Sequence, residues 1–226
     1  MGLGPPRLAR SLLLVALTVA SCGGAAVVDT PSPSPSATAS PTVASAQSWN
    51  VSNTSKATVR VREQLVGVSL PSDAVLTASG AAGSFQINGD GTFSGDSKIS
   101  FDLTTLSSDQ RARDDFVKRD TLATQQFSKA EFVPTKASGL TLPLPASGTF
   151  TFTVTGNMTI RGKTKEVTFD VQATREGANL TATATANPTW KFEDFGLPIP
   201  SVPFRVVSIN DEIKLVVQLV ATGPAA

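Results

Sequence analysis

The strongest constraint on the fold of this chain is a period of two in its apolar residues. Between residues 149 and 160, Phe, Val, Met and Ile positions alternate with threonines and an asparagine. Because successive side chains of a β-strand point to opposite faces of a sheet, such a segment is typical of a half-buried strand. The same alternation recurs in the segments 58–62, 99–104, 167–173, 180–186 and 213–219. The sequence therefore predicts an all-β domain.

Short segments rich in Gly, Asn and Asp separate the predicted strands, and they occupy residues 88–91, 161–163, 176–179 and 209–211. Strands that are joined by such tight turns are antiparallel. An antiparallel sheet of roughly eight strands with one apolar side must either stack on itself or close, and closure removes the exposed edges. A closed barrel of about that size has an interior just wide enough for side chains or for one slender ligand.

One stretch, residues 109–128, breaks the alternation. Within it, Ala112 and Phe116 share a helical face, and two acidic residues stand four positions before basic ones, in the pairs Asp114–Lys118 and Asp115–Arg119. Residues four apart are neighbours on a helix surface, so this pattern predicts a short helical excursion of one or two turns with exposed ion pairs. We interpret the charged cluster as a solvated helix face and not as a binding site.

The amino-terminal residues are typical of an export signal. Arg7 and Arg10 precede an apolar run over 12–20, which is much shorter than the roughly twenty residues that a membrane-spanning helix needs. Val-Ala-Ser then precedes Cys22, and this resembles the lipobox of bacterial lipoproteins. The resemblance implies cleavage before Cys22 and attachment of a lipid to its sulfur. The alternative is an ordinary secretory peptide followed by an unrelated cysteine. We assign residues 1–21 to a lipoprotein signal peptide.

Residues 22–46 comprise the predicted lipidated Cys22 and a Pro/Ser-rich segment without apolar periodicity. Such a composition cannot build a core, so we predict a disordered tether. It would span roughly 25–30 Å as a flexible coil and about 70 Å as polyproline II. Residues 47–226 then form a single β-domain, held by the anchor at the extracytoplasmic side of a bacterial membrane, facing either a periplasm or the cell surface.

Composition excludes several classes of function. The chain has no His and no Tyr and a single Cys, which removes Ser-His-Asp triads, Cys-His pairs and His-ligated metal sites. A net charge of +1 lacks the basic surplus of a nucleic-acid binder. We therefore predict a non-catalytic protein without a cofactor, a metal or a nucleic-acid partner.

Residues 156–171, GNMTIRGKTKEVTFDV, resemble the central motif of the YceI-like proteins, a polyisoprenoid-binding periplasmic family. Other features that are similar to this family follow in the same order along the chain. They are Trp49, Gly83 with Phe85, and the segments 103–106, 113–116, 127–132, 194–196 and 211–213. The resemblance covers nearly all of residues 47–226. It implies an extended antiparallel β-barrel, lipocalin-like in shape, that encloses an apolar tunnel for a long isoprenoid chain such as a quinone tail.

Binding is the function that this combination favours, since each methylene moved from water to an apolar lining contributes roughly 0.8 kcal/mol. The candidate lining residues share the apolar face of the predicted strands, and two further aromatic residues are expected near a mouth. The strand residues are Phe101, Phe150, Phe152, Met158, Phe169 and Leu215, and the mouth residues are Trp190 and Phe195. The partner would be an isoprenoid or another long-chain lipid.

Two alternatives remain open at this point. The domain would be a ligand-free structural or adhesion module if its interior were filled by its own side chains. A hydrolase or isomerase would need convergent carboxylates in a polar cleft. The sequence leaves open whether the domain forms a homodimer.

Overall fold

The computed structural model describes residues 46–201 and 205–224. The predicted signal peptide, Cys22 and all but the last residue of the predicted tether lie outside the described residues. Alternating burial along the strands confirms the period of two, as in β7, where every second residue from Val167 to Arg175 is buried. The strands are β1 (Gln47–Val51), β2 (Lys56–Leu65), β3 (Ser72–Ile87), β4 (Lys98–Ser107), β5 (Lys129–Ser138), β6 (Ser147–Ile160), β7 (Lys163–Glu176), β8 (Asn179–Ala186) and β9 (Val206–Thr222).

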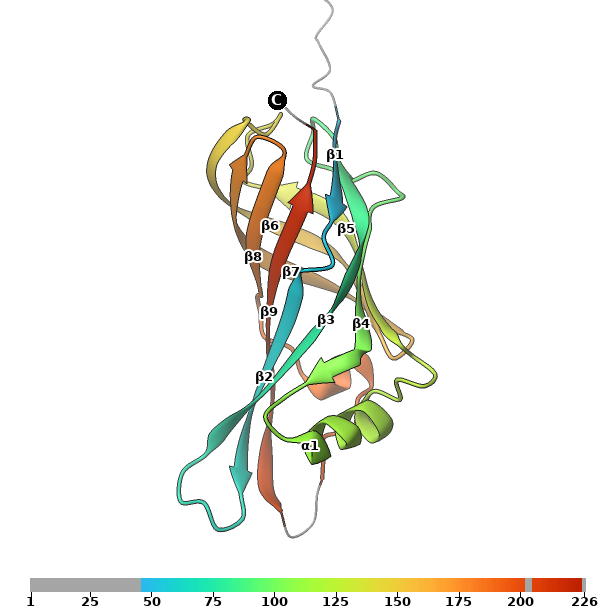
Figure 1. Ribbon diagram of the computed structural model, residues 1–226, viewed down its shortest axis with the longest axis vertical. Coiled ribbons are helices and arrows are strands. Elements are labelled where there is room, and N and C mark those ends of the chain that lie inside the picture. Colours follow the sequence, from blue (N-terminus) through green and yellow to red (C-terminus); the bar gives the residue numbers. More distant parts are fainter. Residues whose placement is uncertain (1–45, 202–204, 225–226) are drawn as a thin grey trace, which may run out of the picture. The chain divides into compact units, whose positions relative to one another are not determined.

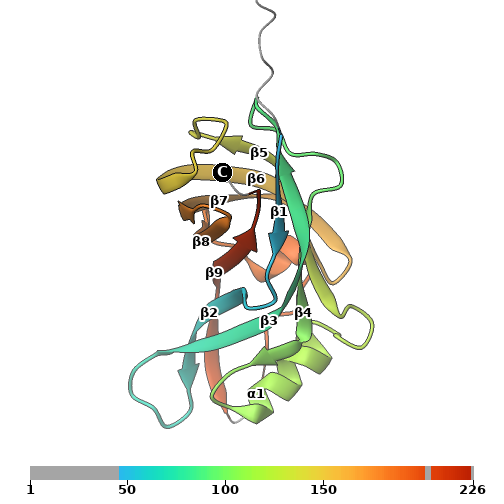
Figure 2. The same ribbon diagram turned by 45° about the horizontal axis from the view of Figure 1, so that its top comes forward.

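Within the described residues, the nine strands form a single antiparallel sheet in the order β1-β3-β2-β9-β8-β7-β6-β5-β4. β4 also pairs with β3, and this pairing closes the sheet into a ring (Figures 1 and 2). β1 and β2 share one position between β3 and β9: β1 pairs with both strands near Asn50, and β2 pairs with both farther along. The predicted all-β antiparallel fold is confirmed, with eight strand positions around the ring.

Tight turns join several consecutive strands. Arg161 and Gly162 connect β6 to β7 with positive φ angles of 49° and 73°. Two such residues in succession match the right-handed twist of a hairpin. The predicted turn at 209–211 is wrong, because these residues lie inside β9. There the register against β2 shifts between Val61 and Glu63, so the polar residues form a bulge instead of a turn.

The predicted helical excursion is confirmed as α1 (Arg111–Phe116) followed by the π-helical turn η1 (Val117–Thr121), whereas its predicted ion pairs are wrong. Among the described residues, neither Asp114–Lys118 nor Asp115–Arg119 forms an ion pair. Asp114 is buried and accepts a hydrogen bond from Ser108 Oγ (2.6 Å). The π-helical turn displaces the two basic residues from the α-helical four-residue spacing.

Candidate ligand-binding cavity

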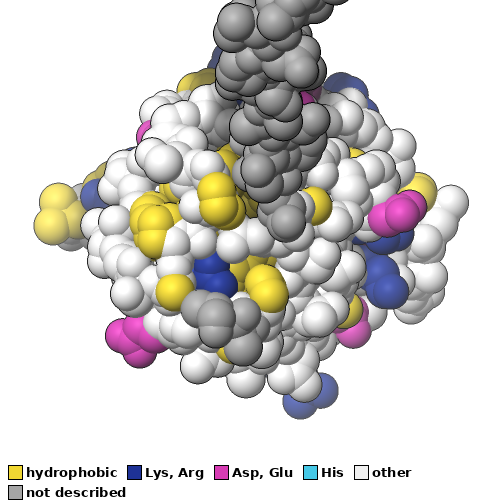
Figure 3. Space-filling model, turned by 90° about the horizontal axis from the view of Figure 1, so that it is seen from above, with side chains coloured by type: hydrophobic (Ala, Val, Ile, Leu, Met, Phe, Trp, Pro, Cys, Tyr) yellow, Lys and Arg dark blue, Asp and Glu magenta, His cyan; other side chains and the backbone are white. Residues whose placement is uncertain are grey.

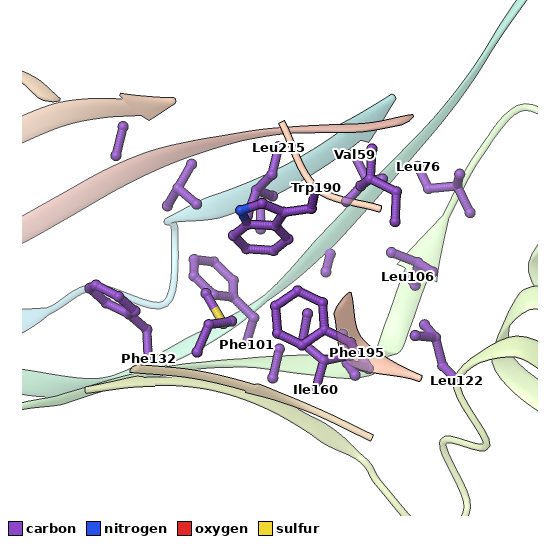
Figure 4. Close-up of a pocket in the computed structure, with 18 of the residues that line it drawn as sticks. Val59, Leu76, Phe101, Leu106, Leu122, Phe132, Ile160, Trp190, Phe195 and Leu215 are labelled. Carbon is purple, nitrogen blue, oxygen red and sulfur yellow. The ribbon is translucent and has the colours of Figure 1, made fainter. Parts of the chain in front are cut away.

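The ring encloses a cavity of about 700 Å³ with an almost entirely apolar lining. This volume lies within the roughly 300–1,000 Å³ of pockets that bury small-molecule ligands. Side chains from distant parts of the chain converge on it, among them Leu76, Phe101, Trp190 and Leu215 (Figure 4). The interior is therefore partly empty, which a close-packed structural module would not show.

Strand register explains why these side chains meet. β6 pairs with β7 without a shift over its whole length, so Phe152 lies opposite Val171 and Val154 opposite Phe169. Directly paired residues point to the same face of a sheet. Each pair thus contributes two apolar side chains to the cavity wall, while Thr153 and Asp170, which pair between them, point to the opposite face.

Aromatic residues form a continuous row across the interior. Phe132 lies edge-on to Phe169 at 5.3 Å between ring centroids, and Phe169 lies edge-on to Trp190 at 6.0 Å. Trp190 contacts Phe195 at 5.0 Å. Phe132 and Phe169 belong to strands, and Trp190 forms an isolated β-bridge with Ile213 of β9. Phe195 belongs to the 3-10 helix η2 (Phe192–Phe195). Such edge-to-face contacts hold the rings in fixed orientations.

Two lysines of β7 hold η2 against the sheet. Lys163 Nζ donates to the carbonyl oxygen of Glu193 (2.8 Å), and Lys165 forms an ion pair with Asp194. Burial by itself would raise the pKa of Asp194, but the hydrogen bonds from Lys165 and from the Lys191 N–H outweigh it and lower the pKa below its ordinary value of 3.8. The carboxylate therefore stays ionised and keeps Phe195 in place.

The structure brings most of the predicted lining residues together. Those that line the cavity are Phe101, Phe152, Met158, Phe169, Trp190, Phe195 and Leu215. Phe150 does not line it, because its ring lies over Gly148 of its own strand, where an added Cβ would be 3.2 Å from Phe150 Cζ. Trp190 and Phe195 are 5% and 1% exposed, so they lie in the interior and not at a mouth. Whether these residues contact a ligand stays a prediction.

Sequence reasoning missed lining residues from the strands without a clear alternation. Trp49 comes from the short β1, Phe85 from the Gly- and Ala-rich β3, and Phe132 from β5. Trp49 and Phe85, like Phe132 within the segment 127–132, belong to the family resemblance but were not predicted to line the cavity. The aromatic residue itself was the available signal at Phe132, which pairs with Met158 across the β5–β6 ladder.

The end of the ring that carries β1 is closed. Leu144, from the β5–β6 connection, is buried in the cavity lining, and the Gln47 amide exchanges two hydrogen bonds with the Leu144 backbone (2.8 and 3.2 Å). Arg175, only 2% exposed, places its guanidinium 4.9 Å from the centre of the Trp49 ring. It donates to the carbonyl oxygens of Leu144 (2.7 Å), Gly177 (2.8 Å) and Pro224 (3.0 Å). Seen from above, this end is largely uncharged, with most charged side chains toward its edge (Figure 3).

The opposite end of the cavity is open. The lining residues that remain exposed lie there, before and within α1 and η1 and just before β9; they are Gln110, Ala112, Asp115, Arg119 and Arg205. Glu63 of β2 and Arg113 of α1 flank this mouth and form an ion pair of 2.6 Å with side chains 6% and 14% exposed. Arg113 also pairs with Asp109 at 2.6 Å. This polar border is the part of the lining that the apolar pattern did not predict.

Charged and metal-ligating groups are sparse around the cavity within the described ranges. No group of three or more His, Cys, Asp or Glu residues that could hold a metal ion occurs in them. A search of the same residues finds no helix with the length and hydropathy to cross a bilayer. Among the residues that the structure describes, the charged ones that line the cavity sit at its mouth, and most of them form ion pairs.

A closed antiparallel sheet around an apolar cavity that opens at one end is an architecture suited to a hydrophobic ligand. The family model of the YceI-like domain matches residues 49–221, and the chain belongs to this family. UPF0312 proteins of Pseudomonas putida and Pseudomonas fluorescens are each 32% identical to the chain, over 57% of its length and 70% of theirs. These matches confirm the predicted family.

Solved structures share the fold. Burkholderia cenocepacia BcnA matches with a TM-score of 0.54 at 20% identity, over 74% of this chain and 96% of BcnA. A polyisoprenoid-binding domain from Saccharophagus degradans, implicated in plant cell wall breakdown, matches with a TM-score of 0.54 at 12% identity, over 78% of this chain and 98% of that domain. At these identities the two neighbours show the shared fold.

Proposed function

We propose that this domain binds a long-chain isoprenoid, or a similar amphiphilic lipid such as a quinone with its tail, and carries or stores it without chemical change. The observation that carries the proposal is the empty apolar cavity of about 700 Å³ that opens at one end. A five-carbon prenyl unit transferred into it from water contributes roughly 4 kcal/mol, at about 0.8 kcal/mol per carbon. A few buried units therefore outweigh any single polar contact.

The geometry also favours one orientation for such a ligand. The closed end, with Trp49 and Leu144, is apolar toward the cavity, and the mouth has the Glu63–Arg113 ion pair at its border. An amphiphile gains most when its tail occupies the closed end and its polar group stays at the mouth, because a polar group in an apolar interior loses its hydration. We expect the chain to enter tail first.

Lipid extraction tests this proposal. The protein, purified without detergent from a bacterial host that makes isoprenoids, is extracted with solvent, and the extract is analysed by mass spectrometry. Ala182→Phe fills part of the cavity from β8, while Thr183→Phe places the same ring on the exposed outer face of the same strand. We expect co-purified lipid in the wild type and in Thr183→Phe, and much less in Ala182→Phe.

An extract without isoprenoid or acyl lipid from a folded wild-type protein would contradict carriage and favour a ligand-free structural or adhesion module. Equal lipid in the two Phe variants would place the ligand outside the cavity.

The same proposal includes attachment to a bacterial membrane through a lipid on Cys22, at its extracytoplasmic side. The lipobox-like Val-Ala-Ser before Cys22 supports it. Metabolic labelling with an alkyne fatty acid tests it: we expect label on the wild type and none on Cys22→Ser, which should move from the membrane to the soluble fraction. Labelling that persists in Cys22→Ser would contradict the anchor.

A further inference from the structure

The exposed apolar side chains of the domain gather around the cavity mouth. Among the described residues, the large hydrophobic side chains that remain exposed are Val66, Val68, Leu70, Ile199 and Val207. We call these residues the apolar rim. The three residues Val66, Val68 and Leu70 lie in the connection from β2 to β3. Ile199 lies between η2 and β9, and Val207 lies at the start of β9, where this strand pairs with β2. Their exposed fractions range from 47% to 74%.

The two sides of the rim are adjacent in space. Val66 donates its N–H to the carbonyl oxygen of Arg205 (3.0 Å), and Leu65 pairs with Val206. Figure 1 shows the β2–β3 connection and the start of β9 extending together from the lower end of the sheet. The neighbouring residues Leu65, Pro200 and Val206 line the cavity. The rim is therefore continuous with the apolar interior through the mouth.

We propose that the apolar rim inserts into the surface of a lipid bilayer and places the mouth of the cavity against the acyl region. The inference rests on the proposed function, because a long apolar chain that leaves the cavity through water would lose the burial that holds it. A rim in contact with the bilayer lets the chain pass between membrane and cavity along a continuous apolar path.

The size and chemistry of the rim favour a bilayer over a protein partner. Five half-exposed aliphatic side chains offer on the order of 500 Å², less than the roughly 800 Å² per partner of a stable protein interface. Protein interfaces concentrate their energy in Trp, Tyr and Arg, whereas Val and Leu are under-represented there. The rim consists of Val, Leu and Ile alone.

The charges near the mouth predict which bilayers the rim binds. They occur in both signs and mostly in pairs: Arg62–Asp73, Glu63–Arg113, Arg113–Asp109 and Arg119–Asp120. Paired charges leave little net attraction for anionic headgroups. We therefore expect apolar insertion that depends weakly on anionic lipid.

Vesicle flotation tests the proposal with residues 46–226, which lack the predicted anchor. This fragment contains every described strand, and the matched region makes up 96% and 98% of two solved neighbours, so the domain folds without the preceding residues. The vesicles are phosphatidylcholine alone or with phosphatidylglycerol. The rim variant is Leu70→Glu with Val207→Glu; the control, Thr181→Glu with Thr185→Glu, adds the same charges to exposed positions of β8.

We expect the wild type and the control to float with phosphatidylcholine vesicles, and the rim variant to bind about tenfold more weakly or worse. Flotation only with phosphatidylglycerol, or equal flotation of all three proteins, would overturn the proposal. A wild type that does not float and that sediments as a dimer would also overturn it, if the rim variant sediments as a monomer. The rim would then bind a second copy of the chain.

Farnesol binding separates this inference from the proposed function. Both tryptophans of the chain, Trp49 and Trp190, line the cavity, so their fluorescence reports its occupancy. We expect the rim variant to bind farnesol as the wild type does, which also shows that it is folded. If the wild type floats with vesicles but its fluorescence does not change with farnesol, the proposed ligand is contradicted, whereas the proposed insertion of the rim into a bilayer is supported.

Discussion

An arginine stands at each end of the cavity, and the two are stabilised in different ways. At the closed end, Arg175 is 2% exposed and donates to three backbone carbonyls, with the Trp49 ring against its guanidinium. At the open end, Arg113 is paired with the carboxylates of Glu63 and Asp109. The first arrangement joins three segments of backbone and closes that end of the cavity; the second leaves an ion-paired polar border beside the mouth.

The comparison shows which end tolerates change. The carbonyls around Arg175 belong to the β5–β6 connection, the β7–β8 turn and the segment after β9, so the guanidinium holds three connections together. Arg113 holds one short helix to one strand, and Asp109 remains as a second partner if Glu63 is lost. We therefore expect substitutions at the closed end to lower the free energy of unfolding more than substitutions at the open end.

Arg175→Met should produce the largest effect. It keeps most of the side-chain length but removes one hydrogen-bond donor from each of three carbonyls, of which Leu144 keeps Gln47 as a donor, and it removes the cation–π contact. We expect the free energy of unfolding to fall by about 3–5 kcal/mol, since hydrogen bonds to a charged group contribute roughly 1.5–3 kcal/mol each and are not additive. Urea unfolding followed by tryptophan fluorescence measures it. A loss below about 1 kcal/mol would show that the closed end is held without Arg175.

Glu63→Gln should cost less, about 1–3 kcal/mol, because Arg113 keeps Asp109 as a partner. In the double variant Glu63→Gln with Arg113→Met, we expect a smaller loss in the free energy of unfolding, because no buried charge is then left without its partner. The same urea unfolding, arranged as a double-mutant cycle, measures the coupling. Additive losses in the double variant would mean that the two side chains act independently.

Asp194→Asn tests the attachment of η2, which lies between the two ends. At pH 7 we expect a loss of about 1 kcal/mol in the free energy of unfolding, because the Lys165 partner is partly exposed. The pKa of Asp194 is lower in the folded protein than its ordinary value of 3.8, so its contribution is present above that value and is lost as the pH falls through the folded pKa.

Unfolding measured across pH 7 to 3 should therefore show the wild type and Asp194→Asn converging toward the acid end. A difference that stays constant over this range would assign the loss to packing of Phe195 and not to the carboxylate charge.

Arg111→Gln should have the smallest effect. Arg111 and Asp115 are 94% and 64% exposed and lie 4.0 Å apart, so their ion pair contributes at most about 0.5 kcal/mol. Thermal unfolding should barely distinguish this variant from the wild type. A marked loss would mean that α1 depends on its outer face and not on Glu63.

The sequence predicted those strands in which apolar and polar residues alternate without interruption. It did not predict the other strands, and the reason is local in each case. β6, β7 and β8 carry a clear two-residue pattern, whereas in β3 the inward residues include the small Ala74 and Ala78, and Val75 on the other face is more apolar than either. β5 contains Pro134 and β1 has five residues. Among the predicted lining residues, Phe150 and Phe152 follow the same pattern, but Phe152 lines the cavity and Phe150 does not, because the Phe150 ring lies over Gly148.

The sequence by itself determined the antiparallel strands, the family and the apolar character of the inner face, because alternation and turn residues act over a few neighbouring positions. The tertiary structure decided that the interior is hollow, which end opens, and that Arg113 pairs with Glu63, fifty residues away. These properties depend on how distant strands meet and how much volume their side chains leave between them, and no local pattern encodes that volume.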